Sequence, residues 1–226
     1  MLSRLFQRRT IWYPTRPGWM VLSAVFGMPT VLWCFFGENF LSHTERLPAE
    51  VLIVEGWIGF EGVRAAKAEF EQGGYSYIVT AGALTDGRWG PERWNYATEA
   101  RALLLREGLP ADKVIAAPAL ETVNQRTFES AAAVCRNLRF KNLHPSTVNV
   151  FTVGAHARRS RLVYAKVLPP ETRVGVVSWT SVENRPGPWW NSSERAADLI
   201  KETAGWLFEA LLNSGRTSNS FVRREP

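Results

Sequence analysis

The stretch AEVLIVEG, residues 49–56, decides the fold, because it is a short continuous apolar run that ends in a glutamate and a glycine. An apolar run of this length is typical of a strand that is buried on both faces. Residues 60–74, FEGVRAAKAEFEQGG, then carry apolar side chains at helical spacing and end in two glycines. This pattern is typical of a helix followed by a stop signal, so the sequence predicts a strand and then a helix.

The same alternation recurs four more times along the chain. The further strand-like runs are residues 75–82, 112–120, 147–156 and 172–179, and the helix-like segments that follow them are residues 95–108, 125–140, 157–168 and 192–212. Apolar strands that alternate with helices favour a mostly parallel sheet, covered on both faces and joined by right-handed crossovers. We therefore predict a Rossmann-like, doubly wound α/β domain with about five strands over residues 49–214.

A segment without charged side chains, residues 17–37, precedes this domain. As a helix it is long enough to cross the roughly 30 Å hydrocarbon core of a bilayer. Trp19 near one end and Trp33 near the other are suited to the interfaces between lipid and water. We predict a transmembrane helix over residues 18–37, joined to the domain by a linker over residues 38–48.

Two alternatives remain open for this segment. A cleaved signal peptide is one, although the run is long for such a peptide and no clear small-x-small cleavage site follows it. A buried core helix is the other, and it is the weaker alternative because no polar face interrupts the run.

The net charge of +6 lies in the two ends of the chain. The basic residues there are Arg4, Arg8, Arg9 and Arg16 at the start and Arg216, Arg223 and Arg224 at the end, the latter beside Glu225. The charges between residues 38 and 215 balance, so we expect no nucleic-acid partner. By the positive-inside rule, residues 1–17 form a cytoplasmic basic tail and the domain is extracytoplasmic. Residues 215–226 are expected to be a flexible basic tail.

Several kinds of site have little support in the composition. The histidines, His43, His144 and His156, are spread along the chain, and Cys34 and Cys135 lie in different segments, so we expect neither a metal site nor a disulfide framework. The sequence has no G-x-S-x-G motif, no Walker loop and no G-x-G-x-x-G after the first strand. It therefore indicates no particular cofactor, and it does not identify a protein partner.

The segment FTVGAHARRS, residues 151–160, ends an apolar strand in concentrated positive charge. In open α/β sheets, ligands bind at the carboxyl ends of the strands, where helix N-termini also favour anions. His156 and Arg159 are therefore candidates for binding a phosphate or carboxylate, with His156 as a proton donor. The alternative is that the arginines form a solvated helix face and that the histidine is a structural hydrogen-bond partner.

Other candidate residues are expected at the same edge of the sheet. Those at or just after strand ends, or on the following helices, are Glu55, Gly82, Glu99, Glu121, Thr127, Glu129, His156 and Arg159. Carboxylates that face a histidine orient its tautomer and tune its charge, as acid–base chemistry requires. An ordinary structural ion-pair network, with Glu129 near Arg126 at helical spacing, is the alternative.

Three short motifs resemble those of the YdcF/SanA/ElyC-like family, a large bacterial group with a Rossmann-like domain and often an N-terminal membrane segment. The matching residues lie between about residues 49 and 179 and are Thr98, Glu99 and Ala100, then Glu121, Asn124, Arg126, Thr127, Glu129 and Ser130, and finally Thr152, His156 and Arg159. The spacing matches throughout. Asn124, Arg126 and Ser130 stand where the family has Ser, Asn and Asn, and VEGW, residues 54–57, stands where it usually has a glycine-rich turn.

The resemblance implies a role in bacterial cell-envelope biogenesis at the inner (cytoplasmic) membrane. It implies His156, Glu129 and Glu121 as catalytic residues, and Arg159, Thr127, Glu99, Glu55, Gly82, Thr152, Arg126 and Asn124 as ligand-binding residues. The first hypothesis is that the domain binds or hydrolyses a phosphate-bearing precursor such as a lipid-linked saccharide, as a phosphoester or pyrophosphate hydrolase or transferase. The second is a non-catalytic scaffold or a module for a nucleotide-like ligand, since S-adenosylmethionine binding is connected with part of the family.

Overall fold

The computed structural model describes residues 13–86, 93–122, 124–180 and 187–212. The chain divides into two compact units, Met1–Gly37 and Glu38–Pro226. The expected tail over residues 215–226 lies outside the described residues, as do residues 1–12 of the N-terminal tail.

The first unit contains the apolar segment, which is helical. Its helix comprises α1 (Arg16–Leu22), a π-helical stretch (Ser23–Gly27) and α2 (Met28–Leu41). Thr15 caps the start, where its hydroxyl accepts a hydrogen bond from the Gly18 amide at 3.3 Å. The 26 residues extend about 39 Å at 1.5 Å per residue. The helix is long and apolar enough to span a membrane, and a signal sequence near an N-terminus has the same properties. Because almost none of it is buried, it is not a core helix.

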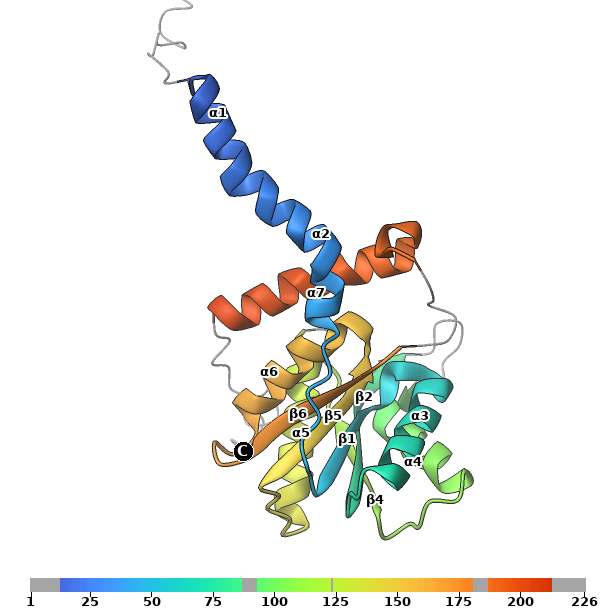
Figure 1. The fold of residues 1–226 in the computed structure, drawn as a ribbon. Helices are drawn as coiled ribbons and strands as arrows, with labels where there is room; N and C mark the ends of the chain where they lie inside the picture. Colours follow the sequence, from blue (N-terminus) through green and yellow to red (C-terminus); the bar gives the residue numbers. More distant parts are fainter. Residues whose placement is uncertain (1–12, 87–92, 123, 181–186, 213–226) are drawn as a thin grey trace, which may run out of the picture. The chain divides into compact units, whose positions relative to one another are not determined.

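The second unit is built on a mostly parallel sheet (Figure 1). Within the described residues the parallel strands, in spatial order, are β4 (Val114–Ala119), β2 (Tyr77–Asp86), β1 (Val51–Glu55), β5 (Thr147–Val153) and β6 (Arg173–Trp179). A sixth strand, β3 (Arg93–Asn95), pairs antiparallel with the end of β2. The predicted α/β class and mostly parallel sheet are confirmed, and β3 is an addition that the sequence pattern did not indicate.

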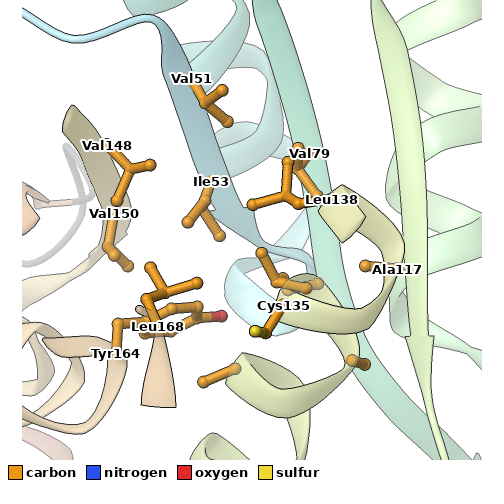
Figure 2. Close-up of a cluster of buried hydrophobic side chains, with 14 of the residues drawn as sticks. Val51, Ile53, Val79, Ala117, Cys135, Leu138, Val148, Val150, Tyr164 and Leu168 are labelled. Atoms are coloured by element: carbon orange, nitrogen blue, oxygen red, sulfur yellow. The ribbon is translucent and has the colours of Figure 1, made fainter. Parts of the chain in front are cut away.

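Helices cover both faces of this sheet. They are α3 (Gly59–Gln72), α4 (Tyr96–Arg106), α5 (Arg126–Phe140) and α6 (Ala157–Val167). A further helix, α7 (Ser193–Leu211), packs against α6 and the turn after β5. Val51 and Ile53 of β1 face the core under α5 and α6, which Figure 2 shows, whereas Leu52 and Val54 face the core under α3 and α4. The continuous apolar run of β1 is therefore explained by burial on both faces.

The order of the strands reverses next to β1. From β1 the chain proceeds to β2 and β4 on one side, and it then returns to β5 and β6 on the other. The carboxyl ends of β1 and β5 lead into short helical turns, Gly56–Ile58 and Gly154–His156, before α3 and α6 begin. Because the following connections diverge at such a point, it is where α/β sheets leave room for a ligand.

Asn149 in β5 connects the segment before β1 to the sheet. Its side-chain oxygen accepts from the Leu47 amide at 3.1 Å, and its amide nitrogen donates to the Leu47 carbonyl at 2.7 Å. The same nitrogen lies 2.9 Å from the Tyr75 hydroxyl. Asn149 is fully buried, so its loss would leave several polar groups without partners in the interior.

We predict that Asn149→Ala lowers the free energy of unfolding by about 2–3 kcal/mol, since the half-buried backbone groups of Leu47 lose two hydrogen bonds and the Tyr75 hydroxyl loses one. Chemical denaturation of the full chain in detergent measures this loss. The matched control is Asn137→Ala, because Asn137 donates only to the Ala133 carbonyl in its own helix and should change stability by less than about 1 kcal/mol. Equal losses in the two variants would contradict this role for Asn149.

Candidate functional site

Glu55, the last residue of β1, is a carboxylate buried at the reversal of strand order. Thr152 of β5 donates a hydrogen bond to it, and the Ser160 hydroxyl of α6 lies 3.1 and 3.2 Å from its two oxygens. His156 approaches from the same side, with Nε2 3.4 Å from Glu55 Oε2. The carboxylate is thus surrounded by donors, which is what an interior charge requires.

His156 lies between two carboxylates. Its Nδ1 is 3.1 Å from Glu202 Oε2, on α7, while its Nε2 faces Glu55. The Nε2 approach is not aligned as a hydrogen bond, and this buried atom has no hydrogen-bond partner among the described residues. The Trp57 ring stands nearly perpendicular to the imidazole, with centroids 4.9 Å apart. The imidazole is therefore fixed on one side and keeps one polar atom unused.

Arg159 completes this group. Its Nε and one terminal nitrogen contact the two Glu202 oxygens at 2.6 and 3.1 Å, a bidentate pair. The other terminal nitrogen lies 3.5 Å from the Thr127 hydroxyl. We call the four residues Glu55, His156, Arg159 and Glu202 the buried ion network. It joins β1, the turn after β5, α6 and α7.

The network shifts the pKa values of its members in opposite directions. Burial alone disfavours each charged form, but the facing His156 holds the pKa of Glu55 below its ordinary 4.5. His156 and Arg159 likewise hold the pKa of Glu202 well below its usual range despite its burial. Burial opposes the charge on His156 as well, yet Glu55 and Glu202 raise its pKa above 6.5. The imidazole is therefore favoured as a cation.

The charge of His156 also decides the roles of its ring nitrogens. Nδ1 lies 3.0 Å from a terminal nitrogen of Arg159, which only donates, and 3.1 Å from Glu202, which only accepts. With the raised pKa, Nδ1 carries a proton and donates to Glu202. Nε2 then also carries a proton, on the side of the ring that faces Glu55.

A cavity of about 450 Å³, the histidine cavity, lies beside this network. Its walls come from the ends of β1 and β2, the start of α5, and the residues His156, Arg159 and Lys201. Arg126, Arg159, Lys201 and the cationic His156 line it against a single acidic residue, Glu55. This balance of charge favours an anionic ligand.

The start of α5 is held in an unusual conformation at this cavity. Gln125, which precedes the helix and lines the cavity, has a left-handed backbone with φ 56° and ψ 40°. A residue with a Cβ pays about 1–2 kcal/mol for this conformation. Strain of this kind is commonly kept at functional sites, where it directs the chain around a ligand.

A smaller cavity of about 240 Å³, the α7 cavity, shares Trp57, His156 and Lys201 with the histidine cavity. Its remaining walls include Glu202 of α7 and the residues that follow Gly37, namely Glu38, Asn39 and Ser42. Trp57 and His156 therefore line both the histidine cavity and the α7 cavity. Among the described residues, no cluster of three or more His, Cys, Asp and Glu side chains is suited to a metal ion.

The structure brings together most of the residues singled out in the sequence. The histidine cavity is lined by Glu55, Gly82, Arg126, Thr127, His156 and Arg159. Thr152 lies behind Glu55 as its donor. Gly82 is close to α4, because a Cβ there would lie 2.6 Å from Tyr96 Cβ.

Five of the expected residues, Thr152 and four others, do not line the histidine cavity. Glu99 is exposed on α4 and lines a separate cavity of about 610 Å³ with Trp57, Phe60, Trp94 and Tyr96, which we call the aromatic cavity. Glu121 and Asn124 are exposed in the segment between β4 and α5. Glu129 is buried in the first turn of α5. Glu121, Asn124 and Glu129 do not line the histidine cavity.

Sequence reasoning did not identify Glu202, Ser160, Lys201 or Trp57. Glu202 and Lys201 lie on α7, where alternating charges look like a solvated helix face. The available signal was the spacing of Arg195, Glu202 and Glu209, which recur every seven residues and so share one side of the helix.

Comparison with protein-family models finds no model that matches the chain, and comparison with curated proteins finds no match.

We predict that the buried ion network gives stability a defined pH dependence. The raised pKa of His156 stabilises the fold fully below pH 6.5, and this contribution is lost as pH rises through the pKa of the folded state. The lowered pKa values of Glu55 and Glu202 stabilise the fold above pH 4.5, and this contribution is lost as pH falls. The contribution of the network is therefore greatest between these two values.

Urea unfolding across pH measures this contribution as the difference between wild type and Glu202→Gln. The difference should shrink as pH rises from 6.5 through the raised pKa of His156 in the folded protein, because His156 then loses the proton that it donates to Glu202. Glu61→Gln, on the outer side of α3, is the matched control and should follow the wild-type profile. Parallel profiles for wild type and Glu202→Gln above pH 6.5 would exclude the network as the cause.

Proposed function

We propose that this protein is a membrane-anchored, extracytoplasmic domain of bacterial cell-envelope biogenesis, which binds and cleaves a phosphate-bearing, lipid-linked precursor. We also propose that its sheet is of the Rossmann-like, doubly wound type and that the chain belongs to the YdcF/SanA/ElyC-like family. The strand order, with its reversal between β1 and β5, supports the fold assignment. The convergence of Glu55, Thr152, His156 and Arg159 supports the family assignment.

The observation that carries the proposal is the set of cationic side chains that line the histidine cavity, namely Arg126, His156, Arg159 and Lys201. A phosphate fits such a cavity, because it accepts hydrogen bonds and is attracted to Arg126 and Lys201. The start of α5, which also lines the cavity, adds the positive end of a helix dipole.

The lipid-linked character of the ligand is supported by the α7 cavity. Glu38, Asn39 and Ser42 line it and follow within a few residues of the apolar helix segment that ends at Gly37. A phosphate group next to a lipid chain would therefore meet this cavity close to a bilayer, if the helix spans one. His156, shared by both cavities, lies where such a head group would be held.

The roles in cleavage follow from the network. A water molecule attacks the phosphorus and releases its proton to solvent as the bond to the leaving oxygen breaks. His156 donates a ring proton to that leaving oxygen, while Glu202 fixes the imidazole through Nδ1. Glu55 keeps the imidazole charged, and Arg159 positions Glu202. Glu121 and Glu129, expected as catalytic residues from the sequence, do not line the cavity, so we assign the proton transfer to His156 alone.

A nucleotide-like ligand such as S-adenosylmethionine is the second candidate. The aromatic cavity, with Trp57, Phe60 and Trp94, favours it because such rings stack on an adenine. The turn after β1 opposes it. A Cβ at Gly56 would lie 2.2 Å from the Tyr96 carbonyl oxygen, so α4 rather than a ligand occupies the open side of this glycine.

We predict that pyrophosphate and a short polyprenyl pyrophosphate raise the thermal unfolding midpoint of the full chain, and that His156→Gln and Lys201→Ala each weaken binding by about tenfold. Lys113→Ala is the control, since Lys113 is an exposed lysine that lines neither cavity and should leave affinity unchanged. Release of inorganic phosphate, measured in parallel, separates cleavage from binding. A shift with S-adenosylmethionine alone would replace this proposal by the second candidate.

We predict that a phosphatase reporter fused after Pro226 is active, because the leading arginines retain the N-terminus in the cytoplasm. The same reporter placed before the apolar helix, at residue 13, should be inactive. A cytoplasmic reporter such as a fluorescent protein should show the opposite pattern. An active fluorescent fusion combined with an inactive phosphatase fusion after Pro226 would place the domain in the cytoplasm and remove the envelope precursor as its ligand.

A further inference from the structure

Helix α7 directs three charged residues, Arg195, Glu202 and Glu209, toward the protein. Glu202 is buried against His156 and Arg159, and Glu209 accepts from Lys166 at 3.0 Å. Arg195 forms a bidentate pair with Glu38 at 2.9 and 2.6 Å. These residues recur every seven positions and form one stripe along the helix. Ion pairs along this stripe therefore hold α7 onto the domain, together with the buried Leu199 and the packed Trp206.

The opposite stripe of α7 is apolar and exposed. Ile200, Leu207 and Leu211 are 67%, 42% and 75% exposed, and Leu212 just after the helix is 69% exposed. Ala197 and Ala204, also exposed, lie on the same side. A surface helix of a protein in water shows the reverse arrangement. A continuous apolar stripe on the outside is a mark of an interaction surface.

The position of α7 indicates what covers this stripe. Phe40 packs edge-on against Trp206 of α7, with ring centroids 5.0 Å apart. Glu38, two residues before Phe40, pairs with Arg195 near the start of the same helix. Arg158 of α6 donates to the Phe40 carbonyl at 2.7 Å and lies over its ring at 3.8 Å. Glu38 directly follows the apolar helix segment in the chain, so α7 is attached to the point where that segment ends.

The sequence that follows α7 is basic. Arg216, Arg223 and Arg224 come after the helix with a single acidic residue, Glu225. Helices that lie in the plane of a bilayer combine an apolar face with nearby basic residues that are attracted to anionic lipids. The chemistry around the exposed stripe is therefore that of a lipid partner.

We propose that α7 is an interfacial helix, whose stripe of Ile200, Leu207 and Leu211 lies in the surface of an anionic bilayer. Its 19 residues provide a contact about 28 Å long. The inward face of the same helix carries Glu202, so the surface that touches lipid and the carboxylate that fixes His156 belong to one rigid element. This inference depends on the proposed membrane anchoring but not on the proposed ligand.

The test uses the full chain in vesicles of phosphatidylcholine and phosphatidylglycerol. Cys34→Ser and Cys135→Ala remove the native thiols, and single cysteines are then introduced as Leu207→Cys, Leu211→Cys, Val25→Cys and Phe140→Cys. Each is labelled with an environment-sensitive fluorophore, and quenching by lipids with a spin label high on the acyl chain is measured. Val25 reports on the apolar helix, and Phe140, 83% exposed at the end of α5, is the matched apolar control.

We expect the labels at 207 and 211 to be quenched at least about twofold more than the label at 140, because interfacial helices enter the bilayer by about 5–10 Å. The excess should fall when phosphatidylglycerol is omitted. Quenching at 25 with none at 207 and 211 overturns the interfacial helix alone. Absence of quenching at all three positions overturns the anchoring as well. A shielded but unquenched label at 207 identifies a second protein copy as the covering partner and also overturns the proposal.

Discussion

The rest of the structure depends on the burial of the Glu55 carboxylate at the end of the central strand β1. An interior charge at this depth is tolerated only with compensating groups, and these come from three elements. Thr152 and Ser160 donate hydrogen bonds to the carboxylate, and the charged His156 faces it at 3.4 Å. Each of these groups fixes a backbone segment: β5, α6 and the turn between them. The strand-order reversal, which would otherwise be an open crevice, is thereby made rigid on the side of β5. The free space remains on the side of β2 and α5, where the histidine cavity lies.

A second constraint follows from the first. A histidine that compensates Glu55 must be charged, and a second carboxylate on its other nitrogen favours that charge. Glu202 supplies it, but a buried glutamate needs a partner as well, which is the bidentate Arg159. The alternation of charges therefore extends outward from β1 to α7. Because part of the inner side of α7 is used for this purpose, Ile200, Leu207 and Leu211 lie on the outer side, and the site chemistry and the exposed apolar stripe have a common origin.

Much of the fold was predictable from the sequence because burial on both faces leaves a simple signal. The runs that became β1 and β5 are continuously apolar, and helical spacing with glycine stops marked α3 and the helices after it. Glu55, Thr152, His156 and Arg159 were predictable as neighbours, since parallel strand ends meet at one edge. Glu202 was not, because it lies 43 positions after Arg159 on a helix whose charges resemble a solvated face. Glu121 and Glu129 were expected at the site because their positions in the chain place them near the edge of the sheet. Chain position does not predict the direction of a side chain, and neither residue lines the histidine cavity.

The residues that attract an anion in the structure differ from the one expected from the sequence. From the sequence, Arg159 was the expected phosphate ligand, but two of its nitrogens already contact Glu202. The two carboxylates of the network balance His156 and Arg159, so the excess positive charge at the cavity comes from Arg126 and from Lys201. Lys201 is 3.7 Å from Glu202, whose oxygens Arg159 holds at shorter distances, and its side chain is largely exposed. The anion is therefore attracted by residues at the mouth of the cavity, whereas the network inside supplies a fixed proton on His156.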